Sequence, residues 1–319
     1  MKKLSVQVLI ILSIGGLLGN IILGAFIFLT PQNLRIPSTT AQQNQFQYLS
    51  PRIFSENQND IRINFINLRT QLQTYTKNVS SQLGIYFEYL PSGTSIGINE
   101  KNEYVLASLL KVPVAMAAYD AVDQGKFAVN QILTLQPSQL DYHFGTLWQK
   151  GAGYQLTLRN AINIMLQQSD NTAARVIFDS LPDGAVEKIF DQLDIPKVLD
   201  QDQPVVTPKN YSSILRSLYL SAVLPKDDSN EILTILTQTD YNDRIAAGVP
   251  SSVKVAHKIG VHTNPEPNTS IFTDCGIIYV PHRPYILCVM MQGPEADALQ
   301  YMKDISKIVY TYVASFKTN

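Results

Sequence analysis

The stretch VLASLLKVPVAMAAYDAV, residues 105–122, is apolar along most of its length, yet it carries a serine and a lysine three residues apart, Ser108 and Lys111. Residues i and i+3 of a helix share one face, so the hydroxyl and the ammonium group can come within hydrogen-bond distance. Apolar surroundings lower the pKa of a lysine, which makes Lys111 a possible base for the hydroxyl of Ser108. The stretch therefore predicts a buried helix that carries an activated nucleophile.

The same spacing occurs a second time, at Ser251 and Lys254, just after Pro250. That segment is polar and follows a proline, so it is predicted to be an exposed loop. Spacing alone does not identify a nucleophile, and the apolar context singles out Ser108 and Lys111. The alternative for Lys111 is a side chain whose stem lies along apolar surface while its ammonium group reaches water.

Two further segments combine polar residues with regular patterns. The triplet Ser169-Asp170-Asn171 follows the helical pattern LTLRNAINIMLQQ, and taken alone it is typical of the N-terminal cap of the next helix. Lys258 and Gly260 lie in the strand-like stretch VAHKIGV, where a glycine allows close approach of a ligand and a lysine attracts a carboxylate. The alternative there is an ordinary edge strand with an exposed lysine.

Strand-like patterns occur near both ends of the folded part. Residues 83–90 and 94–100 are predicted to form a hairpin, and the strands VKVAHKIGV, TDCGIIYV and YILCVMMQ follow Pro250. Helical patterns precede the hairpin, fill the middle and end the chain, and Thr207 with Pro208 is typical of a helix start. This order predicts an antiparallel sheet completed by segments from both ends, with flanking helices and an all-helical insertion.

The order S-x-x-K, S-D-N and K-x-G resembles the signature of class A β-lactamases and penicillin-binding proteins. The stretches ASLLKVPVAMAAYDAVDQGK, LTLRNAINIMLQQSDNTAARVI and DRIAAGVPSSVKVAHKIG are similar to successive blocks of that family, from about Leu83 to the C-terminus. The resemblance implies an α+β fold in three layers, α/β/α, of the β-lactamase/transpeptidase type, with an antiparallel sheet, flanking helices and an all-helical lobe. The active site would lie between the sheet and the lobe.

The resemblance also implies catalytic roles. Ser108 would be the acylated nucleophile, and Lys111 would take its proton directly or through water. Ser169 would relay a proton to the leaving nitrogen, while Asp170 would support the turn. The implied reaction uses no cofactor.

Substrate contacts follow from the same resemblance. Asn171 would bind the amide of the substrate's side chain and Lys258 its carboxylate, while the backbone amides of Ser108 and Val261 would form the oxyanion hole. The third motif is Lys258-Ile259-Gly260, so it lacks the usual hydroxyl beside the lysine. Thr263 is then a candidate for part of the carboxylate recognition.

A second departure concerns hydrolysis of the acyl-enzyme. Class A β-lactamases carry a glutamate in a loop between S-D-N and the T-P that opens the next helix. The only glutamate between Asn171 and Thr207 is Glu187, which lies too early and is predicted to face solvent. The short segment LDQDQPVVTP offers Asp200 and Asp202, whose shorter side chains would need a different backbone path to hold the water.

The N-terminus differs from the rest of the chain. Residues 4–30 carry no charge and exceed the roughly 20 residues that cross a bilayer, so a single transmembrane anchor is predicted. Lys2 and Lys3 on one side of this run, against Arg35 on the other, favour a cytoplasmic location for residues 1–3 and an extracytoplasmic one for the chain after Thr30. Residues 31–54 are polar and predicted to be a tether, and residues 55–319 the catalytic domain.

The composition of the chain argues against nucleic-acid binding and metal binding. The chain has 25 basic and 26 acidic residues and no long basic run, so nucleic-acid binding is not expected. Cys275 and Cys288 flank a turn-like segment and could form a disulfide or be two buried thiols. No metal site is expected, because the histidines lack the usual ligand spacing. They are His143, His257, His262 and His282.

Three hypotheses follow for the function. The first is a membrane-anchored serine hydrolase of the β-lactamase type that opens a β-lactam amide through acyl-Ser108. The second is a D-Ala-D-Ala carboxypeptidase or transpeptidase that acts on peptidoglycan, which the missing glutamate and the tether favour. The third is a catalytically weak protein that binds cell-wall peptides. The five polar residues of the motifs argue against it.

Overall fold

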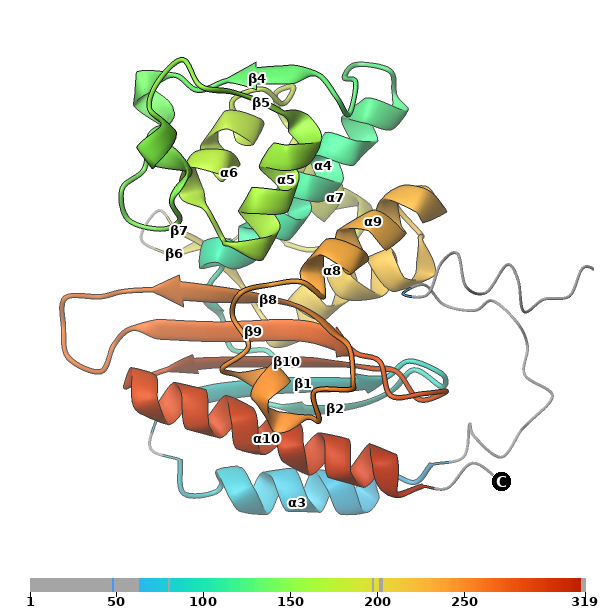
Figure 1. The fold of residues 1–319 in the computed structure, drawn as a ribbon. Coiled ribbons are helices and arrows are strands. Elements are labelled where there is room, and N and C mark those ends of the chain that lie inside the picture. The colour runs from blue at the N-terminus through green and yellow to red at the C-terminus, as the bar shows by residue number, and fades with distance from the viewer. Residues whose placement is uncertain (1–47, 49–62, 80, 197, 201–202, 317–319) are drawn as a thin grey trace, which may run out of the picture. The chain divides into compact units, whose positions relative to one another are not determined.

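A five-stranded antiparallel sheet, in the order β2-β1-β10-β9-β8, is central to the structure, a computed structural model (Figure 1). The structure describes residues 48, 63–79, 81–196, 198–200 and 203–316. The strands of this sheet are β1 (Gln82–Tyr89), β2 (Thr94–Ile98), β8 (Val255–His262), β9 (Ile271–Ile278) and β10 (Tyr285–Gln292).

The sheet confirms that segments from both ends of the folded part pair with each other. Strand β1 lies between β2 and β10, with Gln82 opposite Gln292 and Tyr89 opposite Tyr285. The predicted β1–β2 hairpin is also confirmed. Every residue of β1 after Gln82 is buried, because helices cover both faces of the sheet.

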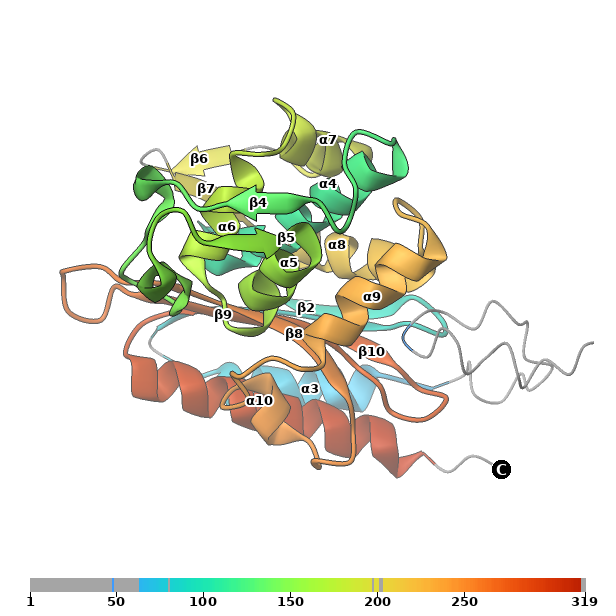
Figure 2. The ribbon, with the colours of Figure 1, turned by 45° about the horizontal axis from the view of Figure 1, so that its top comes forward.

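Helices lie on both faces, which gives the predicted three layers (Figures 1 and 2). One face packs against α3 (Ile66–Thr76) and α10 (Glu295–Ser315), and the residues between form one apolar core. The other face carries a second, larger core. The helices on that side are α4 (Lys111–Asp123), α5 (Leu158–Gln167), α6 (Asn171–Phe178), α7 (Ala185–Gln192), α8 (Pro208–Leu220) and α9 (Lys226–Leu236).

The prediction of an all-helical lobe was wrong in one respect, since short strands also occur there. Strands β4 (Ile132–Thr134) and β5 (Gln155–Thr157) form a pair, and β3 (Tyr104–Val105), β7 (Gln203–Val206) and β6 (Val198–Asp200) form a small sheet. The β3–β7 and β4–β5 pairings join segments distant in sequence, and strands of two to four residues are too short to show a periodic pattern.

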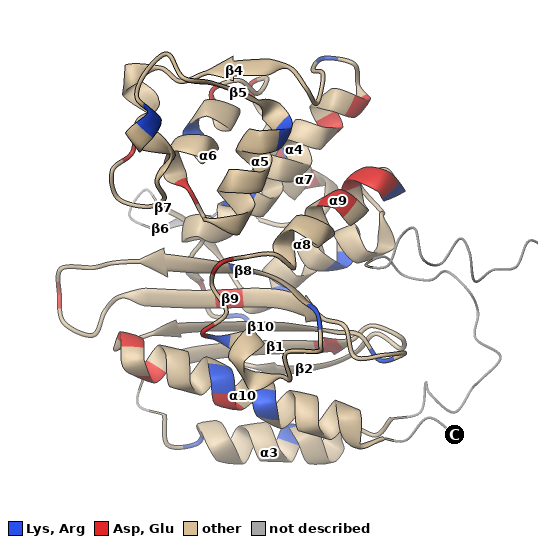
Figure 3. Cartoon of the chain, in the orientation of Figure 1, with Lys and Arg blue, Asp and Glu red and all other residues tan. Residues whose placement is uncertain are grey.

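Helix starts follow local chemistry. Thr207 caps α8 by accepting a hydrogen bond from the backbone N–H of Asn210, with Pro208 at the first helical position, as predicted. Helix α9 has Asp227 and Asp228 in its first turn, where negative charge is favourable. In Figure 3, acidic residues gather at that end of α9.

Cys275 and Cys288 form a disulfide, which the sequence had left open. They lie directly opposite each other in β9 and β10. The connecting turn is centred on Pro281 and His282, where the N–H of Arg283 donates to the carbonyl of Val280 over 2.9 Å, and this turn sets the register that brings the two cysteines face to face.

The predicted anchor, residues 4–30, lies outside the described residues, as does most of the predicted tether. One residue of the tether range, Tyr48, is buried, and its backbone carbonyl accepts a hydrogen bond of 2.8 Å from the hydroxyl of Tyr279. Within the described ranges, no helix combines the length and apolar character needed to cross a membrane.

Candidate active site

Ser108 and Lys111 lie side by side at the start of α4. Ser108 belongs to a short 3₁₀ helix, η1 (Ala107–Leu110), and Lys111 is the first residue of α4, so the α-helix begins later than predicted. The Nζ of Lys111 donates a hydrogen bond of 3.0 Å to the Oγ of Ser108, which confirms the predicted proximity. The second pair, Ser251 and Lys254, is exposed, as expected.

Lys111 is buried, with 5% of its surface exposed, so the alternative of a side chain that reaches water was wrong. Burial lowers the pKa of Lys111 to about 8, against the opposing effect of the nearby carboxylates of Asp170 and Asp141. Its Nζ also donates to the backbone carbonyl of Ser169 and, over 2.7 Å, to the Oδ1 of Asn171. A lysine that loses its proton near neutral pH can act as a general base.

The triplet Ser169-Asp170-Asn171 forms the turn between α5 and α6. Ser169 has a φ of +54°, and Asp170 caps α6 by accepting a hydrogen bond of 2.8 Å from the N–H of Ala173. The other carboxylate oxygen of Asp170 accepts from the N–H of Leu147 over 2.8 Å. The triplet is therefore both the helix cap and part of the site, because Asp170 caps the helix while Ser169 and Asn171 contact Lys111.

Asp170→Ala is expected to destabilise the fold by about 2–4 kcal/mol, because it removes a helix cap and leaves two buried N–H donors without a partner. Denaturant unfolding measures this change. Asp170→Asn, which keeps one acceptor oxygen, should lose less. If Asp170→Ala unfolded at the same denaturant concentration as the parent chain, Asp170 would not support the turn.

Lys258 reaches the same serine from the sheet. It lies in β8, the edge strand, but its side chain is fully buried, so the alternative of an exposed lysine was wrong. Its Nζ donates a hydrogen bond of 2.8 Å to the Oγ of Ser169, which lies 3.3 Å from the Nζ of Lys111. Burial, together with the ammonium group of Lys111, lowers the pKa of Lys258 well below its usual value.

Gly260 lies close to the neighbouring strand β9. A Cβ at Gly260 would lie 2.5 Å from the Oγ1 of Thr273, so a larger residue would force that side chain to move, whereas the backbone carbonyl of Leu106, 3.5 Å away, would be in ordinary van der Waals contact. The next residue, Val261, is half-buried, and Thr263 follows the end of β8 and is exposed. Ile259 is buried and supplies no hydroxyl.

The two candidate aspartates lie on the β6–β7 hairpin. Strand β7 pairs with β3, and the N–H of Leu106 donates to the carbonyl of Pro204 over 2.7 Å, so the hairpin lies beside the segment that leads to Ser108. Asp200 ends the outer strand β6, opposite Gln203, and Asp202 is outside the described residues. Glu187 is exposed on α7, as predicted.

Sequence reasoning missed Asp141, which is buried and joins the site through Asn171. Its Oδ1 accepts a hydrogen bond of 3.2 Å from the Nδ2 of Asn171, and its Oδ2 pairs with Arg175 over 2.6 Å. Burial favours a higher pKa for Asp141, but hydrogen bonds from the N–H of His143 and from Asn171 outweigh it, so the pKa is lowered. The carboxylate of Asp141 is therefore negatively charged, and it orients the side-chain amide of Asn171.

The sequence matches the model of a known protein family. The Beta-lactamase2 model, which describes a beta-lactamase enzyme family, matches residues 67–313. A beta-lactamase from Phocaeicola vulgatus is 24% identical over 243 residues, which cover 68% of this chain and 76% of that protein. The beta-lactamase VEB-1 from Pseudomonas aeruginosa is 20% identical and covers 77% of this chain and 90% of its own.

Solved structures show the same fold. PBP-A matches with a TM-score of 0.71 at 22% identity, over 79% of this chain and 97% of its own. A point mutant of PBP-A, solved as an acyl-enzyme complex with penicillin G, matches with a TM-score of 0.71 at 22% identity, over 78% and 97% of the two chains. At this level of identity the likeness concerns the fold.

Proposed function

We propose, from the premise that this chain belongs to the beta-lactamase enzyme family, that it is a serine hydrolase which opens β-lactam amides through an acyl-Ser108 intermediate. The observation that carries the proposal is the contact of Ser108 with Lys111, joined through the hydroxyl of Ser169 to Lys258. Three segments distant in sequence supply these groups, and each group has a role in acyl transfer.

In the acylation step, the Oγ of Ser108 attacks the amide carbonyl while its proton passes to the Nζ of Lys111. The backbone N–H groups of Ser108 and Val261 would stabilise the negative charge on the carbonyl oxygen. When the C–N bond breaks, Ser169 gives its proton to the leaving nitrogen and regains one from a neighbouring lysine. Lys258 would bind the carboxylate of the substrate, and Asn171 its side-chain amide.

Hydrolysis of the acyl-enzyme is less well supported by the described residues than its formation. The described carboxylates beside the lysines, Asp170 and Asp141, already accept hydrogen bonds from backbone or amide groups, which occupy them structurally. Asp200 and Asp202 stay predictions for the residue that holds the hydrolytic water. Slow deacylation would favour the second candidate function, a D-Ala-D-Ala carboxypeptidase or transpeptidase, in which the natural acyl group comes from a peptide.

Incubating the full-length chain with a fluorescent penicillin should produce a covalent adduct that outlasts removal of the free penicillin, because the two described carboxylates beside the lysines, Asp170 and Asp141, already accept hydrogen bonds and are not free to activate water. Intact mass over time measures formation and loss of the adduct. A long-lived adduct supports the peptidase function, and rapid turnover of a chromogenic β-lactam supports the β-lactamase function. If neither an adduct nor turnover were observed, both enzyme functions would be excluded, and the peptide-binding hypothesis would remain.

We also propose that residues 4–30 anchor the catalytic domain to the membrane on its extracytoplasmic side. The uncharged run supports an anchor, and the disulfide of Cys275 and Cys288 fits an oxidising compartment. The full-length chain should remain in the membrane fraction after an alkaline carbonate wash, whereas a chain lacking residues 1–47 should not. Release of the full-length chain by the wash would contradict the anchor.

A further inference from the structure

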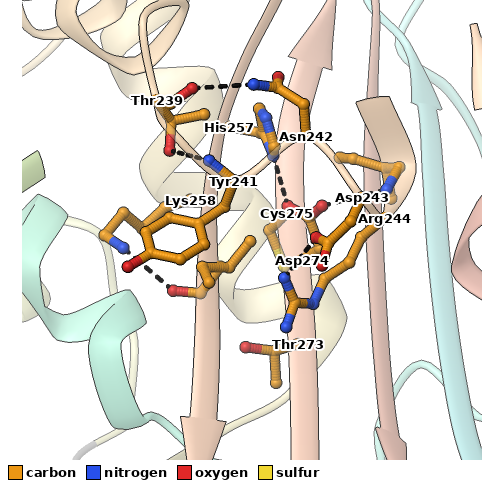
Figure 4. Close-up of polar contacts among 12 residues, drawn as sticks. Thr239, Tyr241, Asn242, Asp243, Arg244, His257, Lys258, Thr273, Asp274 and Cys275 are labelled. Atoms are coloured by element: carbon orange, nitrogen blue, oxygen red, sulfur yellow. Dashed lines mark hydrogen bonds and ion pairs between the residues drawn. The ribbon is translucent and has the colours of Figure 1, made fainter. Parts of the chain in front are cut away.

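Residues 239–245 form a strap that links the two sides of the site. The strap follows α9 on the face of the sheet that carries the lobe and ends at η4 (Ile245–Gly248), which packs against α10 on the opposite face. Between them, the chain crosses over the edge strand β8, as Figures 1 and 4 show. No reaction step in the mechanism above uses these residues.

At one end, the strap binds the last carbonyls of α5. The N–H of Asp240 donates to the carbonyl of Gln167 over 3.1 Å, and the hydroxyl of Tyr241 donates to the carbonyl of Gln168 over 3.1 Å. Carbonyls at a helix C-terminus lack partners within the helix, so these bonds fix where α5 ends. The next residue is Ser169, whose hydroxyl contacts both lysines.

At the other end, the strap binds the sheet beside Lys258. The N–H of Ile245 donates to the Oδ2 of Asp274 over 3.1 Å, and the Oδ1 of Asp274 lies 2.9 Å from the Nδ1 of His257. Asp274 and His257 are fully buried, and His257 directly precedes Lys258 in β8. One end of the strap therefore contacts the residue just before Ser169, and the other end contacts Asp274, which is bonded to the residue just before Lys258.

The middle of the strap is packed. The side-chain amide of Asn242 donates to the carbonyl of Thr239 over 2.9 Å, and Arg244 is buried and pairs with Asp243 over 2.6 Å (Figure 4). The ring of Tyr241 lies 5.7 Å from the ring of Phe144, centroid to centroid. These contacts give the strap a fixed length.

We propose that this strap, anchored by Tyr241 on the carbonyl of Gln168 and by Asp274 on the amide of Ile245, holds the hydroxyl of Ser169 against Lys258. Tyr241 and Asp274 are positioning residues, because they act through Ser169 and Lys258. Without the strap, the turn after α5 could move away from the edge of the sheet, and water would enter between the two groups. The inference rests on the proposed function only in the kinetic experiment below.

The first test needs no activity. In protein labelled with ¹³C at the ε carbon of lysine, the signal of Lys258 is assigned from Lys258→Arg and titrated with pH. Tyr241→Phe removes only a hydroxyl, and it should raise the pKa of Lys258 towards the usual value, because water then reaches the ammonium group. Tyr75→Phe, which removes a hydroxyl bonded to Asp304 beneath the sheet, should leave this titration unchanged.

An unchanged titration of Lys258 in Tyr241→Phe would overturn the proposal, even if the variant were less stable. Thr239→Val is the second variant, since it removes a hydrogen bond of 3.2 Å to the carbonyl of Gln167 at the same end of the strap. It should shift the titration in the same direction, and two unchanged titrations would reduce the strap to a purely structural connection.

The second test is kinetic. Tyr241→Phe should slow acylation by penicillin about threefold to tenfold, the effect of one lost hydrogen bond, and should cause no further loss in a Lys258→Ala chain. Equal losses in both backgrounds would contradict positioning through Lys258. If the parent chain forms no adduct, the proposed function fails, and the lysine titration still decides whether the strap positions the site.

Discussion

Ser108→Ala is expected to abolish covalent labelling by penicillin, with acylation slowed at least about 1,000-fold, because no other hydroxyl contacts Lys111 from within the same helical turn. Intact mass after incubation measures the loss. Ser108→Ala should unfold at the same denaturant concentration as the parent chain, because the substitution removes only one hydroxyl group from a small side chain in η1.

Ser251→Ala is the matched control for Ser108→Ala. Ser251 stands three residues before Lys254, the same spacing, but both residues are exposed. This variant should be labelled at the rate of the parent chain. An adduct of the same mass on Ser108→Ala, or loss of labelling in Ser251→Ala, would show that the nucleophile is misassigned.

Lys111→Met is expected to slow acylation by about 100- to 10,000-fold, the usual contribution of a general base. The parent chain should also show a characteristic pH profile. Lys111 acts as a base only when it is neutral, and its pKa is about 8, so the acylation rate should rise as the pH rises through 8. Below that pH, the acylation rate should fall roughly tenfold for each pH unit, because the neutral fraction of Lys111 falls by that factor.

Stopped-flow labelling of the parent chain and of Lys111→Met across this range measures both effects. The variant should have lost the rise near pH 8, whereas Lys254→Met should retain both the rate and the profile. A pH-independent rate in the parent chain, or a profile that persists in Lys111→Met, would assign the base to another group.

Much of the fold could be predicted from the sequence, because most of its strands and helices are long enough to show the periodic spacing of apolar residues that is typical of each. The hairpin of β1 and β2, the cap of α8 at Thr207 and the final helix α10 depend on residues adjacent in sequence. The short strands β3, β6 and β7 could not be predicted in this way. They are too short to show a period, and the pairing of β3 with β7 depends on contacts between distant residues, such as that between Leu106 and Pro204.

The site was predicted from its motifs, and the structure adds the contacts between them. Ser108 and Lys111 lie as expected, but the burial of Lys258 on an edge strand depends on the lobe that covers it, which no pattern in VAHKIGV encodes. Asp141 was missed for the same reason. Its partners Asn171 and Arg175 lie about 30 residues away in the sequence, and it belongs to no motif.

The pairing of β1 with β10 has a consequence for synthesis. While a ribosome is still adding the last segments, β1 and β2 have emerged, but the strand that separates β1 from β9 does not yet exist. Contacts between chain segments so far apart close slowly, and the nascent chain exposes apolar surface until they do. If penicillin acylates Ser108 as proposed, it should react with completed chains and not with ribosome-bound chains that lack β10, and its reaction would then mark the moment at which folding ends.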